Sequence, residues 1–244
     1  MADLDIAVVN WKTPALTIRC VKSYLAFTPN CQVIIIDNGS EDSSVDEFRA
    51  VFKENQQVLI LPGRTNIGYG PACNLALSVV PNKSKYVVAS NSDIVATPNW
   101  FEPLRKCLEE EKAGIVGPKL LNFNNKIVAA GVVGENRKPI LRGWLADSHL
   151  FSTKEDVIMV TGAVMAFKRD IFEKIGKFPE DLEFYYEDNF ICYRSRELGY
   201  RVIYCPEVPM YHELHGSERR TIVLAEKFRK AKAVFEAKVG YKIS

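Results

Sequence analysis

The chain has 244 residues, a length that suits one α/β domain and allows a substantial core without disulfides or metals. Hydrophobic residues make up 47% and charged residues 25% of it, as in an ordinary soluble globular protein. The formal net charge is only +2, so nothing points to a general nucleic-acid binder.

The cysteines and the N-terminal segment bear on cellular location. No two of the six cysteines form a C-x-x-C pair, so the spacing favours neither a zinc site nor a redox motif. We expect reduced, mostly buried thiols in a cytoplasmic protein. The acidic start Met1–Asp5 has no signal-peptide layout. No apolar run approaches the roughly 20 residues that a membrane span needs.

The first half of the chain alternates segments typical of strands and of helices. Short apolar runs predict strands at 6–9, 33–36, 58–61 and 86–89. The run at 33–36 is β-branched and unbroken, as expected of a strand that is buried on both faces.

Helix-start signals follow these strands. Thr13-Pro14 reads as an N-cap followed by proline at the first helical position, and Ser44 with Glu47 has the capping-box pattern. A further helix is expected at 71–79, and Thr97-Pro98 is expected to open another that ends near Lys112. The alternation predicts a largely parallel sheet with helices on both faces.

The second half is less regular. We expect strands at 158–160, 163–167 and 201–204, the last closed by Pro206, and a helix at about 189–198 that Gly199 ends. The last helix should present one apolar face, made by Leu224, Phe228, Ala231, Phe235 and Val239. Because repeats, low-complexity stretches and linkers are absent from the sequence, a single domain covering 1–244 is the economical interpretation.

Short polar side chains follow all four strands of the first half. The strand ends are Asn10-Trp11, Asp37-Asn38-Gly39-Ser40, Gly63-Arg64-Thr65-Asn66 and Ser90-Asn91-Ser92-Asp93. One such end is usually only a turn. Four of them at the same edge of a parallel sheet predict a ligand crevice instead. The first turn has no glycine, which argues against a dinucleotide fold.

Three groups could carry chemistry at or near this edge. Asp93 could hold Mg²⁺ if the substrate brings a diphosphate, although a capping aspartate is the simpler alternative. Glu187 and Asp188 open a helix beside aromatic rings, where a carboxylate can serve as a general base, or can simply suit the helix dipole. His212 is one of only three histidines and could help to bind Mn²⁺.

Taken in chain order, these segments resemble glycosyltransferase family 2, whose members have the GT-A fold, over nearly the whole chain to about Ser217. The opening strand of that family resembles Val8-Val9-Asn10-Trp11, and its nucleoside-binding strand end resembles Ile34–Ser40. Its N-x-G-F segment resembles Asn66-Ile67-Gly68-Tyr69-Gly70 with Asn74. Its D-x-D-like site resembles Asn91-Ser92-Asp93.

Later segments continue the resemblance. The acceptor-side strand of the family is similar to Val160-Thr161-Gly162-Ala163, and its E-D helix to Phe184–Asp188 with Arg194, Gly199–Arg201 and Tyr204–Pro206. His212 with Ser217 is similar to its late H-x-x-x-x-S segment. Asn91 departs from the first position of D-x-D, and Phe190 stands where rhamnosyltransferase-like members often carry another aspartate.

The resemblance implies an inverting, single-displacement transfer of a sugar from a nucleotide-sugar to a hydroxyl acceptor such as a glycan. We expect a UDP- or dTDP-sugar, because an aspartate (Asp37) beside short amides suits the imide N–H of a pyrimidine. It implies a nucleotide-binding half at about 1–95, an acceptor and catalytic half at 96–216 and a C-terminal helix at 217–244. The nucleotide would be held by Val9, Asn10, Asp37, Asn66, Gly68, Asn91 and Ser92.

The implied roles extend to the metal, the base and the acceptor. Asp93 with His212 would hold Mg²⁺ or Mn²⁺. Asp188 would be the general base, and Glu187 would orient the acceptor or support Asp188. Gly162 lies on the acceptor side, and Trp144 could stack on an acceptor sugar or belong to the core.

Alternatives remain at this point. A nucleotidyltransferase would share the metal and diphosphate site but would need no base at Asp188. A glycosidase would need two matched carboxylates and no nucleotide site. A non-catalytic sugar-nucleotide-binding module is the non-enzyme alternative. The basic last helix is read as a solvated face, with peripheral contact to the inner membrane face as the alternative. Its cations are Lys227, Arg229, Lys230, Lys232 and Lys238.

Overall fold

The computed structural model describes residues 3–81, 83–182, 185–213 and 222–243. Phe184 and Ser217, which belong to the resemblance, lie outside these residues, as does the boundary at 216/217. The side chain of Leu224 also lies outside them.

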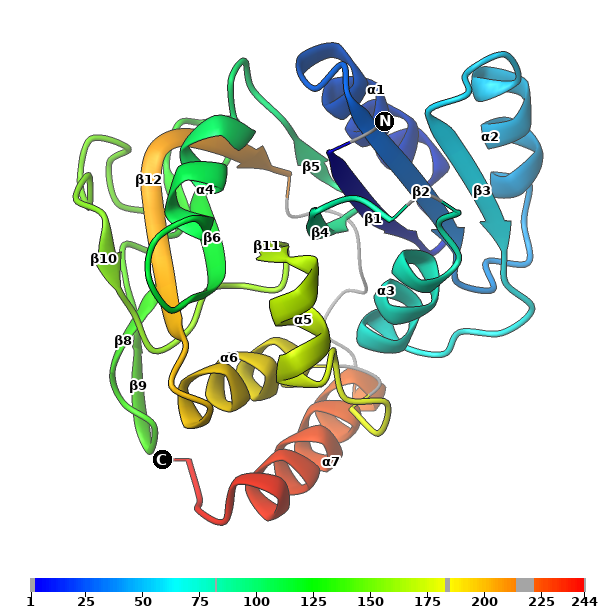
Figure 1. Cartoon of the computed structure of the whole chain (residues 1–244). Helices are drawn as coiled ribbons and strands as arrows, with labels where there is room; N and C mark the ends of the chain where they lie inside the picture. Colours follow the sequence, from blue (N-terminus) through cyan, green and yellow to red (C-terminus); the bar gives the residue numbers. More distant parts are fainter. Residues whose placement is uncertain (1–2, 82, 183–184, 214–221, 244) are drawn as a thin grey trace.

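One twisted sheet runs through the molecule in the order β10-β12-β6-β11-β4-β1-β2-β3 (Figure 1). Four strands of the first half are parallel and follow one another as β3-β2-β1-β4. They are β1 (Leu4–Asn10), β2 (Cys31–Asp37), β3 (Val58–Pro62) and β4 (Tyr86–Asn91). All four predicted strands are therefore confirmed, as is the mixed α/β class.

The second half extends the same sheet beyond β4. Strand β11 (Val164–Lys168) is antiparallel to β4 and to β6 (Ala113–Leu121), and β12 (Arg201–His212) is parallel to β6. Shorter strands complete the structure at the margins. They are β5 (Ile94–Val95), β7 (Ile127–Ala129), β10 (Glu155–Asp156) and the hairpin β8 (Val132–Glu135) with β9 (Lys138–Leu141).

Helices cover both faces, as predicted. On one face the core contains side chains of α1 (Pro14–Phe27), α2 (Ser44–Phe52) and α4 (Phe101–Leu108). On the other face it contains side chains of α3 (Tyr69–Ser78), α5 (Arg169–Ile175) and α6 (Glu187–Glu197). Alternate residues of β1 enter the two clusters, because successive strand side chains point to opposite faces.

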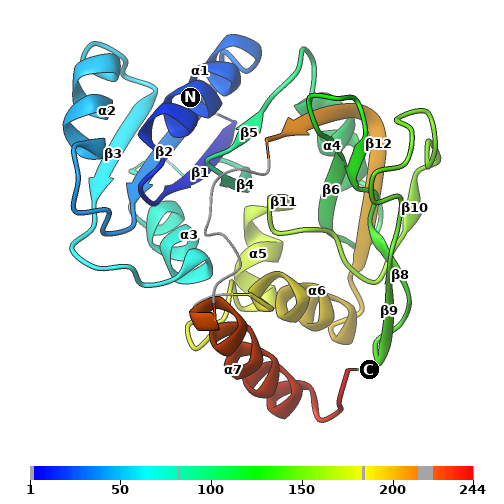
Figure 2. The same cartoon turned by 180° about the vertical axis from the view of Figure 1, so that it is seen from behind.

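The last helix, α7 (Ile222–Val239), lies outside these layers against α6 (Figure 2). Ala231, Phe235 and Val239 are buried, which confirms the predicted apolar face for these positions, whereas Phe228 is 44% exposed. Three of its cations face acidic partners, in the pairs Lys230–Glu226, Lys232–Glu236 and Lys238–Asp181. Among the described residues, no helix combines the length and hydropathy of a membrane span.

Several local predictions were wrong. Ser44 is the first residue of α2 rather than its cap, and the Asp42 carboxylate accepts the Ser44 N–H at 2.9 Å. Helix α4 begins at Phe101, since the Thr97 hydroxyl donates to the carbonyl of Pro209 at 2.7 Å instead of capping a helix. Residues 158–160 form no strand beyond one bridge at Met159.

Two long strands differ from expectation, each for its own reason. Strand β12 does not stop at Pro206, because its register against β6 shifts between Cys205 and Met210, and proline is tolerated at such an irregularity. Strand β6 was not predicted, although all its residues are buried. Its Gly117 lies where an added Cβ would come within 2.6 Å of Val160, so this glycine allows close packing and does not mark a loop.

Candidate active site

The ends of β1 and β2 form a buried polar cluster. Asn10 and Asp37 are paired in register, and the Asn10 amide donates to the Asp37 carboxylate at 2.7 Å. Ser40 donates its hydroxyl and its backbone N–H to the same carboxylate, the latter at 3.1 Å. Asn10 and Asp37 are 0% and 4% exposed. These bonds fix the Asp37 carboxylate in one orientation at the end of its strand.

The loop after β3 packs against this cluster. The Asn38 side chain donates to Asn66 at 3.1 Å and to the carbonyl of Gly68 at 3.2 Å, and it accepts the N–H of Ile67 at 3.0 Å. Gly39 has a φ of +72°, and a Cβ there would meet the backbone of Thr65 at 2.5 Å. Only glycine allows this close approach of the two loops.

The hydroxyls of Thr13, just before α1, and of Thr17, in its first turn, connect this cluster to the end of β4. Thr17 donates to the Asn10 side chain at 2.7 Å, and the hydroxyls of Thr13 and Ser92 lie 3.1 Å apart. Thr13 stands at the predicted N-cap position but makes no capping bond, because its hydroxyl is used here. The side chain of Val9 points into the core, so Val9 can offer a ligand only its backbone.

Asp93 and His212 meet beyond the end of β4. Strand β5 pairs with β12 so that Ile94 faces His212, which brings the His212 Nε2 to 3.0 Å from the Asp93 Oδ1. The backbone N–H of Glu213 donates to the Asp93 carbonyl at 3.0 Å. The Nδ1 of His212 is buried and has no hydrogen-bond partner among the described residues. A carboxylate and an imidazole in this arrangement fit a divalent cation.

A third group forms where α6 begins. The Asp188 carboxylate accepts the N–H of Gly162 at 2.8 Å and that of Asn189 at 2.8 Å. A Cβ on Gly162 would come within 3.1 Å of the Asp188 Cβ, so glycine permits this contact. Burial raises the pKa of Asp188 despite these two N–H donors. A carboxylate with a raised pKa is suited to accept a proton near neutral pH.

Glu187 is even less accessible, at 8% exposure, and its Oε2 has no hydrogen-bond partner among the described residues. Burial and the neighbouring Asp188 charge raise the pKa of Glu187 to about 8. Near neutral pH Glu187 is therefore mostly protonated, and it can donate a hydrogen bond but cannot serve as a base.

The two halves of the site are adjacent at one sheet edge. The N–H of Asn91 at the end of β4 donates to the carbonyl of Ala163 at 2.9 Å, directly beside Gly162. Tyr69, at the start of α3, donates its hydroxyl to the carbonyl of Gly162 at 2.7 Å. The candidate nucleoside, metal and base residues thus lie at the same edge of the sheet, at the ends of neighbouring strands.

The comparisons with known proteins identify the family and the fold. The family model "Glycosyl transferase family 2" matches residues 5–176. The chain belongs to this family. It is 23% identical over 222 residues to an uncharacterized glycosyltransferase of Haemophilus influenzae, covering 87% of this chain and 65% of that protein. It is 22% identical to an N-acetylglucosaminyl-diphospho-decaprenol L-rhamnosyltransferase of Mycobacterium tuberculosis, covering 77% and 68% respectively.

The length of these relatives varies widely. An uncharacterized protein of Sinorhizobium fredii is 26% identical over 77% of this chain, but the chain spans only 22% of that protein.

Two solved structures have a similar fold. GalNAc-T7 with UDP, GalNAc and Mn²⁺ superposes with a TM-score of 0.71 at 14% identity, over 96% of this chain and 50% of that one. The mannosyltransferase PcManGT of Pyrobaculum calidifontis with GDP-Man and Mn²⁺ has a TM-score of 0.68 at 16% identity, over 97% and 64%. The family 2 chain therefore has the GT-A fold that its motifs implied.

Several side chains bonded to the candidate site residues received no individual role from the sequence. Thr13, Thr17, Ser40, Asn38 and Tyr69 all bond to predicted site residues. Their positions after strands or at helix starts were visible, but such positions are common to ordinary turns and caps. Only the partner across the sheet, far away in sequence, distinguishes a site residue from a cap.

Two aromatic features lie in the second half of this family 2 chain. Trp144 is 53% exposed, so its suggested core role is wrong, while its role toward an acceptor stays a prediction. Phe123 stacks on Tyr211, the residue before His212. Their ring centroids lie 5.4 Å apart and their planes meet at 8°. Phe123 is itself 55% exposed, so this stacked pair presents an aromatic surface near the Asp93–His212 pair.

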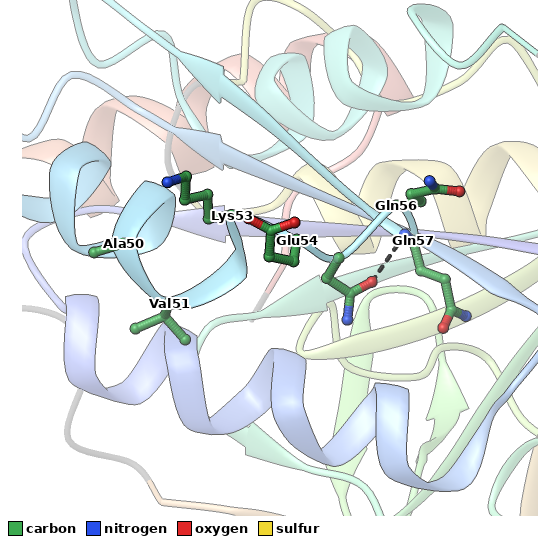
Figure 3. Close-up of a pocket in the computed structure, with 7 residues that line it drawn as sticks. Ala50, Val51, Lys53, Glu54, Gln56 and Gln57 are labelled. Carbon is green, nitrogen blue, oxygen red and sulfur yellow. Dashed lines mark hydrogen bonds between the residues drawn. The ribbon is translucent and has the colours of Figure 1, made fainter.

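A surface hollow elsewhere does not belong to the site. It has a volume of about 580 Å³ and lies between the end of α2 and the residues before β3 (Figure 3). Its lining, Ala50–Val51 and Lys53–Gln57, precedes β3, so the hollow lies at the amino edge of the parallel strands. The ligand edge of such a sheet is the carboxyl edge.

Proposed function

We propose that this family 2 glycosyltransferase moves a sugar from a UDP- or dTDP-sugar to an acceptor hydroxyl with inversion and with the help of a divalent cation. The observation that carries the proposal is the adjacency of two groups at neighbouring strand ends. The Asp93–His212 pair follows β4, and the Gly162-bound Asp188 carboxylate lies beside β11. A leaving diphosphate and an attacking hydroxyl need these two functions within one site.

The nucleoside would be held by the first half of the chain, at about 1–95. Asp37 accepts three bonds from Asn10 and Ser40, and an ionised carboxylate offers about four lone-pair sites. The remaining capacity suits the imide N–H of a pyrimidine. The UDP bound to GalNAc-T7 supports this choice, whereas the GDP-Man of PcManGT makes a purine the outcome to test against.

Asp93 and His212 would hold Mg²⁺ or Mn²⁺, and the buried Nδ1 of His212 is consistent with a ligand in this region. The Mn²⁺ in both neighbouring structures supports a metal. A bound cation would neutralise charge on the departing nucleoside diphosphate. Asn91 and Ser92, beside Asp93, would orient the diphosphate from the end of β4.

Asp188 would take the proton of the acceptor hydroxyl while that oxygen bonds to the anomeric carbon and the bond to the diphosphate breaks. Its raised pKa and its fixed orientation by Gly162 and Asn189 suit a base. Glu187, mostly protonated, would donate a hydrogen bond to the acceptor or support Asp188. A single displacement inverts the anomeric carbon, and the site needs no second nucleophile.

The acceptor would approach from the second half, at 96–216, past Gly162 and with Trp144 as a further contact. The cytoplasm is the cellular location that we propose for the protein. The ion pairs of α7 and its packing on α6 favour a solvated face over a membrane contact for this helix.

A thermal-shift screen tests the proposal. UDP or dTDP with Mn²⁺ should raise the melting temperature, because a ligand that binds only the folded state stabilises it. The shift should shrink without Mn²⁺ and in Asp93→Ala, while ADP should act weakly. GDP giving the largest shift would overturn the pyrimidine assignment. An equal shift in Asp93→Ala would overturn the metal site, and no shift with any nucleotide would overturn the transferase assignment.

A further inference from the structure

Two cysteines and a glutamate meet away from the candidate active site. Cys107 lies in the last turn of α4, and Cys205 and Glu207 lie on β12 where its register against β6 shifts. One ligand atom from each of the three residues lies within 4.8 Å of the others. Cys205 and Glu207 are two positions apart on a strand, which directs both side chains to the same side.

The thiols and the carboxylate of this cluster differ in solvent exposure. The two thiols are buried, at 2% for Cys107 and 1% for Cys205, whereas Glu207 is exposed. The Cys205 thiol donates to the Glu207 carboxylate at 2.7 Å. Two sulfur ligands are thus held by the core, and the carboxylate provides a side open to solvent through which an ion can enter.

We propose that Cys107, Cys205 and Glu207 form a structural Zn²⁺ site. Tetrahedral zinc with bonds of about 2.3 Å to sulfur and 2.1 Å to oxygen places neighbouring ligand atoms about 3.6 Å apart, within the spread seen here. Thiolates select zinc or Cu(I), and the hard carboxylate favours zinc. Water or a further side chain would fill the fourth position.

Charge and proton balance are favourable. Zn²⁺ would displace the protons of both thiols to solvent and bind two thiolates and one carboxylate, leaving a net charge of −1. Lys154 lies close enough to Cys107 and Glu207 to offset that charge. Lys154 also pairs with Glu110, which Arg201 contacts at 3.0 Å. The site therefore lies within a mixed-charge shell.

The site would tie α4 to β12, the strand that ends at His212. Its loss should therefore weaken the packing of α4 on the sheet before it affects the active site. The sequence indicated no zinc site because the two cysteines are separated by almost the whole second half of the sheet. Neither belongs to a C-x-x-C pair, and only the topology brings them together.

Metal uptake by the full chain tests the proposal. The reduced protein, incubated with Zn²⁺ and desalted, should retain about one zinc per chain, and Co²⁺ should give the charge-transfer absorption of thiolate ligands. Cys107→Ala and Cys205→Ala should lose both signals. Glu207→Gln should weaken zinc affinity by at least the 10- to 100-fold typical of lost outer-shell partners. At a hundredfold excess over Kd, zinc should raise Tm by about 5–10 °C.

Cys31→Ala is the matched control, since Cys31 is equally buried on β2 and lies outside the cluster. It should bind zinc like the wild type. The cobalt signal separates this site from the Asp93–His212 pair, which has no sulfur. Absence of zinc retention and of the cobalt band in the wild type would overturn the proposal, as would wild-type uptake by Cys107→Ala.

Discussion

Strand β1 carries the buried Asp5 near its amino end and the buried Asn10 at its carboxyl end. The two edges of the sheet at which these residues lie differ in how completely their buried polar groups are hydrogen-bonded. At the amino end, Asp5 is 0% exposed and receives the Ser84 hydroxyl at 2.7 Å, the Ser84 N–H at 3.0 Å and the Arg169 guanidinium. Arg169 also donates to the carbonyls of Ser84 and Leu77, at 2.9 Å and 3.0 Å. The chain itself saturates this cluster.

At the carboxyl edge of the sheet Asn10 is also fully hydrogen-bonded, but two groups from other elements at this edge retain unused capacity. The Nδ1 of His212 and the Oε2 of Glu187 are buried and have no hydrogen-bond partner among the described residues. Burying a polar atom without a partner costs about 1–3 kcal/mol. The contrast indicates that the amino-edge cluster stabilises the fold, whereas the carboxyl edge bears a cost that a ligand can offset.

The largest effect is expected from a substitution at the carboxyl edge of the sheet. Asp188→Asn keeps the shape of the side chain but cannot accept a proton, so turnover should fall by about 10² to 10⁴-fold, the usual scale for a general base. Donor affinity, measured by calorimetry, should change little. The melting temperature should fall moderately, because the amide oxygen can accept only one of the two N–H bonds from Gly162 and Asn189. A collapse of donor binding would instead assign Asp188 to the donor pocket.

The second-largest effect is expected from a substitution at the amino edge of the sheet. Asp5→Ala leaves the Arg169 cation buried without its carboxylate, so the free energy of unfolding should fall by about 3–5 kcal/mol in a urea titration. Turnover per folded molecule should be unchanged. Asp170→Ala, which breaks an ion pair that is 62% exposed on the aspartate side, is the matched control and should cost at most about 1 kcal/mol. An equal loss in both variants would contradict the contrast.

The sequence was sufficient for the parallel half of the fold because β-branched runs and the turns between them are local signals. It was insufficient for β6, where Gly114, Gly117 and Pro118 interrupt the apolar run. An added Cβ at Gly114 would meet the Ser195 hydroxyl at 2.3 Å. Those glycines are explained by contacts with residues far away in sequence, which periodicity does not contain.

The candidate site follows the same rule. The polar strand ends and the Glu187-Asp188 pair were recognisable because their residue types stand at fixed places in local motifs. The pairing of Asp93 with His212 was suggested only by family resemblance, and it depends on β5 meeting β12. The hydroxyls of Thr13 and Tyr69 could not be assigned, because their partners lie across the sheet.

The smallest expected effect, taken per pH unit, is a pH dependence of stability that Glu187 confers. Its pKa is about 8 in the folded chain, raised from 4.5 by burial and by the Asp188 charge. Below about pH 4.5 the group is protonated in both states, and its contribution to stability is fully present. Between about 4.5 and 8 the unfolded chain loses this proton while the folded chain keeps it. Stability from this group should therefore fall by up to about 1.4 kcal/mol for each pH unit.

The measurement is the difference in unfolding free energy between the wild type and Glu187→Gln at several pH values from 5 to 8. The glutamine variant cannot ionise, so its stability relative to the wild type should rise with pH through this window and level off above about pH 8. Glu54→Gln, at an exposed site just after α2, should show no such slope. A flat difference for Glu187→Gln would mean that Glu187 is ionised in the folded chain. Glu187 would then compete with Asp188 as the base, and the contrast between the two edges of β1 would no longer rest on it.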